Sequence, residues 1–162
     1  MEKIRFDDVA ALRRHVSAEF GPWSEGLVVT QAMIDEFAEL SGDRQWIHVD
    51  VERARRESPF GTTIAHGFLT LALLPRIGRG ARERAEFEIV GHGSVANYGS
   101  DKLRFLAPVP AGAMLRSRSR LASVEAGEKG TRVAREIAVH VVGQERPALL
   151  YQMIVLYQPA RG

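Results

Sequence analysis

The sequence predicts an α+β domain in which a curved antiparallel β-sheet wraps around a long buried central helix. The first observation is the segment 64–74, where only His66 and Thr70 are polar and Gly67 is the one glycine. A helix that is apolar nearly all round must be buried nearly all round. The second observation is the alternation of apolar and polar residues through much of the C-terminal half, which is typical of half-buried strands. One buried helix with several long strands indicates a sheet that curls around the helix.

The chain before this helix is predicted to hold a short strand and two helices. Residues 25–30 have strand character, and Thr30 is a suitable N-cap for a helix that Gly42 ends. The apolar positions of that helix recur at helical spacing, at Met33, Ile34, Phe37 and Leu40. A short charged helix is expected next, over residues 51–57, with Pro59 closing it.

The buried helix is expected over residues 64–74. Thr62 or Thr63 could cap its first turn. The segment is too short for a membrane span, which needs about 20 apolar residues. Pro75 removes a backbone donor and is expected to loosen or kink the later part of the helix.

The strands are expected to follow one another as antiparallel neighbours. Turns at residues 127–130 and 143–147 are short enough for hairpins. We expect strands on either side of these turns and before them, over residues 87–98, 114–123, 133–141 and 149–157.

The composition favours a single globular domain over residues 1–162. Of these 162 residues 45% are hydrophobic, which argues against disorder. The absence of cysteine excludes disulfides and a cysteine nucleophile, and it is compatible with the cytoplasm, where we expect the protein. The net charge is only +2 and no basic run is interleaved with aromatics, so nucleic acid is not an expected partner. No membrane association is expected either.

The pair Asp43 and His48 is the first candidate for chemistry. The two residues lie just after the predicted helix end, and their spacing suits a loop that folds both side chains onto one point. Asp and His together can hold and activate a water near neutral pH. The alternative is that Asp43 caps a turn and His48 is an ordinary packed histidine. Trp46 and Ile47 between them favour a buried segment, and hence the catalytic interpretation.

Gly67 is the second candidate. A backbone N–H at the start of the buried helix has no partner within the helix, and glycine lets a ligand carbonyl come close. The alternative is that Gly67 only permits close packing of a strand, and the residues alone leave both open. His66 beside it is interpreted as a structural histidine rather than a catalyst.

Two further groups are interpreted mainly as structural. Asn97 precedes Tyr98-Gly99, a setting typical of a turn or bulge, although the amide could also orient water or substrate. Three arginines alternate along one predicted strand, at Arg116, Arg118 and Arg120, and such a stripe is usually a solvated face. The alternative is contact with ligand phosphates.

Two motifs together resemble the MaoC-like dehydratases. They are SGDRQWIH at residues 41–48 and PFGTTIAHGFL at residues 59–69, and the similarity continues through residues 97–99, 104–105 and 108–110. The nearest branch includes the NodN-like proteins and the bacterial (R)-specific enoyl-CoA hydratases. This resemblance implies a hot-dog fold, a homodimer, and reversible addition of water to the 2,3 double bond of an acyl thioester, giving the (R)-3-hydroxyacyl product.

The resemblance also assigns roles by position. Asp43 and His48 would be the catalytic pair, and the Gly67 N–H would bind the thioester carbonyl oxygen. His66, Gln45, Trp46 and Asn97 complete the expected substrate-binding set. The chain departs from the better-known hydratase pattern, which has Asn-Pro where this chain has Gln45-Trp46. Gln45 keeps an amide able to orient Asp43 or the water, and Trp46 is expected to change the pocket wall.

The resemblance leaves other functions to be weighed. The substrate would be a thioester of coenzyme A or of acyl carrier protein, and no cofactor or metal is part of this expectation. Hot-dog thioesterases resemble this fold but commonly carry a carboxylate on the central helix, and none occurs between Thr62 and Arg82. A non-catalytic acyl-thioester binding or regulatory module is the other alternative. Such a module has no need of an Asp/His pair.

Overall fold

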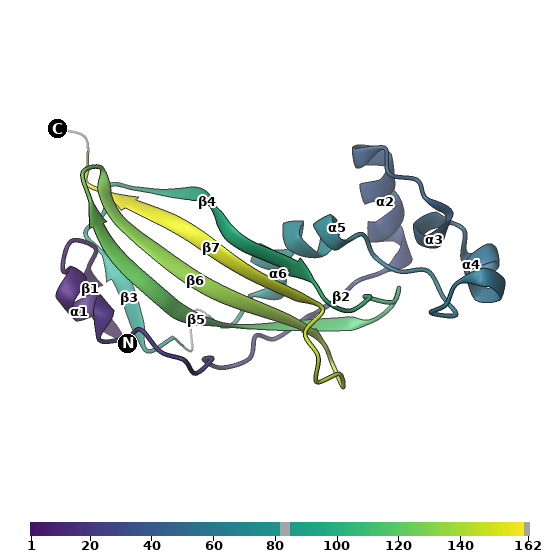
Figure 1. Cartoon of the computed structure of the whole chain (residues 1–162), viewed down its shortest axis with the longest axis horizontal. Helices are drawn as coiled ribbons and strands as arrows, with labels where there is room; N and C mark the ends of the chain where they lie inside the picture. Colours follow the sequence, from purple (N-terminus) through teal and green to yellow (C-terminus); the bar gives the residue numbers. More distant parts are fainter. Residues whose placement is uncertain (82–84, 161–162) are drawn as a thin grey trace.

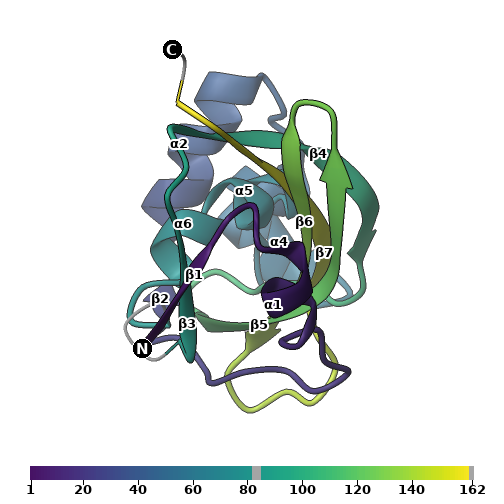
Figure 2. The same ribbon diagram turned by 90° about the vertical axis from the view of Figure 1, so that its left-hand side faces the viewer.

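A five-stranded antiparallel sheet forms the body of the molecule, as the computed structural model of residues 1–81 and 85–160 shows. Its strand order is β2-β5-β6-β7-β4. The strands are β2 (Leu27–Val28), β4 (Ser94–Phe105), β5 (Met114–Gly127), β6 (Gly130–Val141) and β7 (Leu149–Gln158). The long strands curve past α5 and α6, so the predicted antiparallel sheet curled around helix is confirmed (Figures 1 and 2).

Three helices gather at one end of the sheet, where β2 leads into them (Figure 1). They are α2 (Gln31–Ser41), α3 (Trp46–Val49) and α4 (Val51–Glu57). The side chain of Thr30 caps α2 by accepting from the Met33 N–H, and Gly42 ends it with a left-handed φ of 78°. Both ends were predicted. Leu40, however, was assigned to the apolar stripe and is 85% exposed.

The central helix is shorter and more broken than predicted. It divides into α5 (Gly67–Ala72) and α6 (Leu74–Ile77), with Pro75 in the first turn of α6. The predicted loosening near Pro75 is confirmed. The start at residue 64 is wrong, because Ile64 and Ala65 are extended and donate backbone hydrogen bonds to Ile47 and Val109.

The capping and burial of this helix also differ from the prediction. His66 takes the N-cap position, whereas the buried Thr63 hydroxyl donates to Gln31 instead. Phe68 is 63% exposed, so the helix is not buried all round. The inward side of α5, with Leu69, packs on the sheet, and its outward side is exposed.

Two predicted strands have different limits. The segment 87–98 divides at Gly91, whose φ is 79°, into β3 (Phe87–Val90) and the start of β4. The strand expected over 114–123 continues to Gly127, where a tight hairpin leads to β6. The predicted hairpin at 127–130 is therefore confirmed.

The N-terminal residues form a unit that the sequence had not indicated. Strand β1 (Glu2–Arg5) pairs in parallel with β3, and helix α1 (Val9–Arg13) follows it. Together they cover one end of the sheet (Figures 1 and 2). Their side chains share a buried cluster with Leu121, Val124 and Val133 of β5 and β6.

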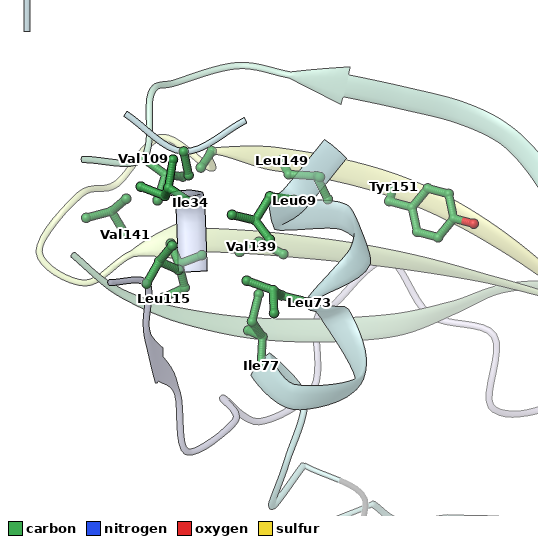
Figure 3. Close-up of a cluster of buried hydrophobic side chains, with 13 residues drawn as sticks. Ile34, Leu69, Leu73, Ile77, Val109, Leu115, Val139, Val141, Leu149 and Tyr151 are labelled. Carbon is green, nitrogen blue, oxygen red and sulfur yellow. The ribbon is translucent and has the colours of Figure 1, made fainter. Parts of the chain in front are cut away.

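A larger apolar cluster holds the central helix on the sheet. Figure 3 shows Leu69 of α5, Ile77 of α6 and Leu73 between the two helices pointing toward the side chains of β5 and β6, with Leu115 and Val139 fully buried. This packing fixes the start of α5, where the candidate site lies. In the part of the chain that the structure describes, no helix has the length and apolar character needed to cross a membrane.

Candidate active site

Three side chains from separate segments meet beside the start of α5. Asp43 follows the glycine that ends α2, His48 lies in α3, and His66 is the N-cap of α5. A carboxylate oxygen and one ring nitrogen from each histidine lie within 4.8 Å of one another. The two imidazoles stack, with centroids 3.8 Å apart. The structure thus brings the predicted pair together and adds His66 to it.

His48 is held from both its ring and its backbone. Its Nδ1 lies 2.7 Å from the Ile64 carbonyl oxygen, which can only accept, so Nδ1 is the protonated nitrogen. In the neutral ring the Nε2 atom therefore carries a lone pair. The backbone carbonyl of His48 accepts from the Gln31 amide at 2.8 Å. Only 9% of the residue is exposed.

Gln31 is a supporting residue that sequence reasoning missed. Its amide Nε2 also donates to Asp35, and its Oε1 accepts from the buried Thr63 hydroxyl. The residue therefore ties the start of α2 to α3 and to the segment before α5. Nothing in the sequence distinguishes it from a surface glutamine in the first turn of a helix.

His66 is fixed in the same manner as His48. Its Nε2 lies 2.8 Å from the backbone carbonyl oxygen of Asp43, so Nε2 is the donor. Its Nδ1 is buried and has no hydrogen-bond partner among the described residues. The ring therefore holds the Asp43 backbone in place.

Asp43 also makes the turn contact that the alternative interpretation predicted. Its Oδ1 lies 3.4 Å from the Gln45 N–H, a long hydrogen bond, and its own N–H lies 3.3 Å from the Ser41 hydroxyl. Neither contact uses the second carboxylate oxygen. Asp43 can therefore cap the turn with one carboxylate oxygen and keep the other for the site.

Gly67 lies where two cavities meet. As the first residue of α5 it has a backbone N–H without an intrahelical acceptor. A Cβ at this position would lie 2.7 Å from the Phe105 ring, so close approach of that ring also requires glycine. Both interpretations of Gly67, open N–H and close packing, are thus compatible with the structure.

The two cavities differ in their walls. One, of about 340 Å³, is mainly apolar and runs from His48 and Gly67 along Ile64, Thr70, Phe105 and Val109. The other, of about 330 Å³, contains Asp43 and His66 together with Phe37 and Phe68. Both include His48 and Gly67. A molecule with an apolar chain and a polar reacting centre could therefore occupy both and react where they join.

Three of the residues expected to bind substrate lie outside these cavities. Gln45 is exposed at the N-cap of α3 and makes no side-chain cap bond. The Arg53 guanidinium lies over the Trp46 ring, with its central carbon 4.3 Å from the ring centroid, and Trp46 lines neither cavity. Asn97 pairs with Val155 in β4 beside a register shift, which confirms the predicted bulge and places it away from both cavities.

The arginine stripe of β5 is not the solvated face that its pattern indicated. Phe20 and Trp23 cover it, with guanidinium-to-ring distances of 4.5 to 5.1 Å. The Nε atoms of all three arginines are buried. Burial, together with the neighbouring charges of Arg118 and Arg116, lowers the pKa of His140 on the adjacent strand. The sequence had not shown that residues 20–23 return over this face.

The comparison with known families decides the relationship. The model of the family described as "MaoC like domain" matches residues 19–142, which include the site. The chain belongs to this family. The resemblance in residues 41–48 and 59–69 is thereby confirmed, and with it the family's hot-dog fold.

Individual relatives extend the match over nearly the whole chain. The 3-hydroxyacyl-thioester dehydratase Z of Mycobacterium tuberculosis is 43% identical over 94% of this chain and 97% of its own length. Nodulation protein N of Rhizobium leguminosarum bv. viciae is 37% identical over 98% and 94%. The solved structure of the (R)-hydratase from A. caviae involved in PHA biosynthesis has a TM-score of 0.65 and 20% identity, covering 87% of this chain and 98% of that one.

Proposed function

We propose that this MaoC-like protein is a hydro-lyase that adds water reversibly to trans-2-enoyl thioesters and forms (R)-3-hydroxyacyl thioesters. The observation that carries the proposal is that Asp43 and His48 lie close together beside two cavities, each lined by both His48 and Gly67. The 43% identical relative named as a 3-hydroxyacyl-thioester dehydratase supports the same reaction.

The reaction follows from the positions of these groups. Asp43 and the free Nε2 of His48 hold a water against C3 of the enoyl thioester. The pair accepts one proton of this water as its oxygen bonds to C3, and the proton is returned to C2. Negative charge that develops on the thioester oxygen is stabilised by the Gly67 N–H. The pair acts as one acid–base unit that takes up the proton and returns it.

The apolar cavity supports an assignment for the acyl chain. Its walls of Ile64, Phe105 and Val109 suit a hydrocarbon chain, whereas the cavity that contains Asp43 suits the thioester and its pantetheine arm. Coenzyme A or acyl carrier protein would supply that arm as part of the substrate. The reaction needs no redox change, so the proposal includes no cofactor.

The assembly and setting form part of the proposal. Strand β4 is one edge of the sheet and carries the exposed side chains Val95, Tyr98 and Phe105. A second copy covering this edge would remove unpaired backbone groups and apolar surface from water, so we propose a homodimer. We further propose one hot-dog domain over residues 1–162, acting in the fatty acid metabolism of the cytoplasm. Light scattering that gave the mass of one chain would contradict the dimer.

Purified protein with crotonyl-CoA tests the reaction. The absorbance of the conjugated enoyl group should fall, and chiral analysis should give the (R)-product. The Asp43→Asn variant should lose turnover, while Asp7→Asn, which changes an exposed carboxylate at the other end of the molecule, should not. Binding of the thioester without turnover would favour the non-catalytic module. Release of free coenzyme A would favour the thioesterase.

A further inference from the structure

The ring of Phe105 lies directly against Gly67, the glycine that lines both cavities. A Cβ built on Gly67 would lie 2.7, 2.8 and 3.0 Å from the Cδ1, Cε1 and Cγ atoms of this ring. Atoms of folded proteins essentially never lie closer than 3.0 Å to a Cβ, so a methyl group on Gly67 has no room beside the ring as it stands. Phe105 also lines the apolar cavity, together with Gly67 and His48. The ring therefore forms part of the cavity wall at the start of α5.

The position of the Phe105 ring is fixed from two directions. Phe105 is the last residue of β4 and pairs with Leu149 of β7, and the residue after it donates a backbone hydrogen bond to Ala148. The ring itself meets the ring of Phe68 edge to face, with centroids 5.4 Å apart. Moving the ring away from Gly67 would therefore disturb its contact with Phe68 while the backbone stays in place.

The proposed reaction places the first carbons of the acyl group beside this ring. The thioester oxygen lies at the Gly67 N–H, and C3 lies beside Asp43 and His48. C2 is bonded to both the thioester carbon and C3, so it lies between these points. Because Phe105 lines the same cavity as Gly67 and His48, its ring borders the space for C2. A hydrogen at C2 takes little of this space, whereas a methyl group there widens the acyl group toward the wall.

We infer that Phe105 determines specificity at C2, so that the protein takes 2-enoyl thioesters with hydrogen at C2 and discriminates against those with a methyl branch there. The inference rests on the proposed function for the position of the acyl group. A methyl branch at C2 displaces the ring from Gly67 and disturbs its contact with Phe68. One additional carbon in an apolar pocket typically changes discrimination by about 10–200-fold.

Steady-state kinetics with crotonyl-CoA and its 2-methyl analogue, tigloyl-CoA, tests the inference in the active protein. The methyl group also lowers the reactivity of the double bond itself, so the measure is the change in the ratio of the two kcat/KM values between variants. Phe105→Leu should raise the relative kcat/KM for tigloyl-CoA at least about 10-fold, because the smaller side chain opens the space beside Gly67. A thermal melt checks the folding of this variant, and Phe105→Met provides a second one.

Phe60→Leu is the matched control. Phe60 lines the same cavity and is 43% exposed, against 45% for Phe105. None of the three atoms nearest to the Cβ position of Gly67 belongs to Phe60, since all three belong to Phe105. Phe60→Leu should therefore leave the ratio of the two kcat/KM values as it is in the unaltered chain.

Binding of saturated thioesters measures the same restriction without turnover. Butyryl-CoA and 2-methylbutyryl-CoA have no double bond to hydrate, and calorimetric titration gives both Kd values. The unaltered chain and Phe60→Leu should bind the branched compound at least about 10-fold more weakly, and Phe105→Leu should bind the two alike.

The outcomes separate this inference from the proposed function. Hydration of crotonyl-CoA with the same ratio in Phe105→Leu as in the unaltered chain would overturn the inference alone. Equal affinity of the unaltered chain for the two saturated thioesters, or an equal change of ratio in Phe60→Leu, would also overturn it. The expected discrimination in binding by a chain that does not hydrate crotonyl-CoA would uphold the restriction at C2 and reject only the hydration. Failure to bind either thioester would overturn both.

Discussion

The two ends of the sheet are filled in different ways. At the N-terminal end, Ile4, Phe6 and Leu12 close against β5 and β6 in a continuous apolar cluster. At the other end, where α2 to α4 lie in Figure 1, the packing of α5 leaves two cavities beside His48 and Gly67. Both ends use the same strands. What differs is the covering element, a capped helix at one end and an extended segment leading to a glycine at the other.

This difference shows why the candidate chemistry lies at one end alone. The side chain of Asp8 caps α1, and Leu12 is completely buried beneath it. At the site end the residues before Gly67 are extended, and the backbone carbonyl of one of them, Ile64, orients the His48 ring. Substitutions at the two ends should therefore affect different properties of the protein.

The largest effect is expected at the site end. Asp43→Asn or His48→Gln should lower kcat/KM for crotonyl-CoA by about 10²–10⁴-fold, because each removes half of the acid–base pair. The melting temperature should change little for Asp43→Asn, whose carboxylate makes only a long contact at 3.4 Å. Steady-state kinetics with a thermal melt checks both. Turnover within a few-fold of the unaltered chain would exclude these residues as the catalytic pair.

The opposite result is expected at the N-terminal end. Leu12→Ala removes a side chain with 0% exposure, and such truncations typically lower the free energy of unfolding by about 2–5 kcal/mol. Denaturant titration measures this loss. The kcat/KM of the folded variant should be unchanged because the residue lies in the cluster away from both cavities. A fall in kcat/KM without a fall in stability would show that the two ends are coupled.

Gly67→Ala should change activity more than stability. The added Cβ would lie 2.7 Å from the Phe105 ring, but that residue is 45% exposed and can move outward. The methyl group would then stand beside the N–H proposed to stabilise the thioester oxygen. Removing one oxyanion donor typically costs about 10²–10³-fold, so a loss of about 10²-fold in kcat is the upper expectation. A stability loss as large as that of Leu12→Ala would favour the packing interpretation of Gly67.

Gln31 allows a finer test, because among the described residues it meets the proposed catalytic pair only at the His48 backbone. Gln31→Leu removes the donor to the His48 carbonyl and the acceptor of the Thr63 hydroxyl. Loss of positioning should lower kcat by about 10-fold, well below the ~10²-fold that a 1 Å misplacement can cost. Gln31→Glu keeps the acceptor for Thr63 but not the donor to His48, so it is the matched control. Equal kcat in both variants and the unaltered chain would show that α3 holds His48 without this contact.

The sequence predicted the parts of this molecule that depend on local patterns. The ends of α2 follow from Thr30 and Gly42, whose preferences operate within a single turn. Alternation along β6 and β7 likewise identified both strands. Asp43 and His48 could be paired because they lie only five positions apart and a recognisable motif contains them.

Long-range placement could not be predicted in the same way. The segment 64–74 reads as one helix, but hydrogen bonds from Ile64 and Ala65 to distant residues hold its start extended. The alternation of the arginines in β5 indicates a solvated face, but in the folded chain Trp23 packs over them. Gln31 gains its importance only from partners 17 and 32 residues away. Each of these depends on tertiary contacts that composition and periodicity do not report.

The smallest expected effect concerns the outer face of the sheet at the site end. His140 lies between two core residues, Val139 and Val141, but points toward Trp23 on the opposite face. Burial and the charges of Arg118 and Arg116 lower its pKa, so the folded protein binds this proton less readily than the unfolded chain does. Stability from this residue is complete above its unfolded pKa of about 6.5 and is lost as the pH falls below that value.

His140→Gln should therefore flatten the fall in unfolding free energy between pH 7 and pH 5. Denaturant titrations across that range give the slope, with His92→Gln as the control for loss of any histidine. His48 and His66, which lie on the site face of the sheet, are unchanged in this variant, so a change in slope is assigned to the opposite face. If the slope is unchanged, groups other than His140 determine the acid sensitivity of the fold. If the slope flattens, the stacked histidines His48 and His66 can take part in the site without determining the pH dependence of the unfolding free energy.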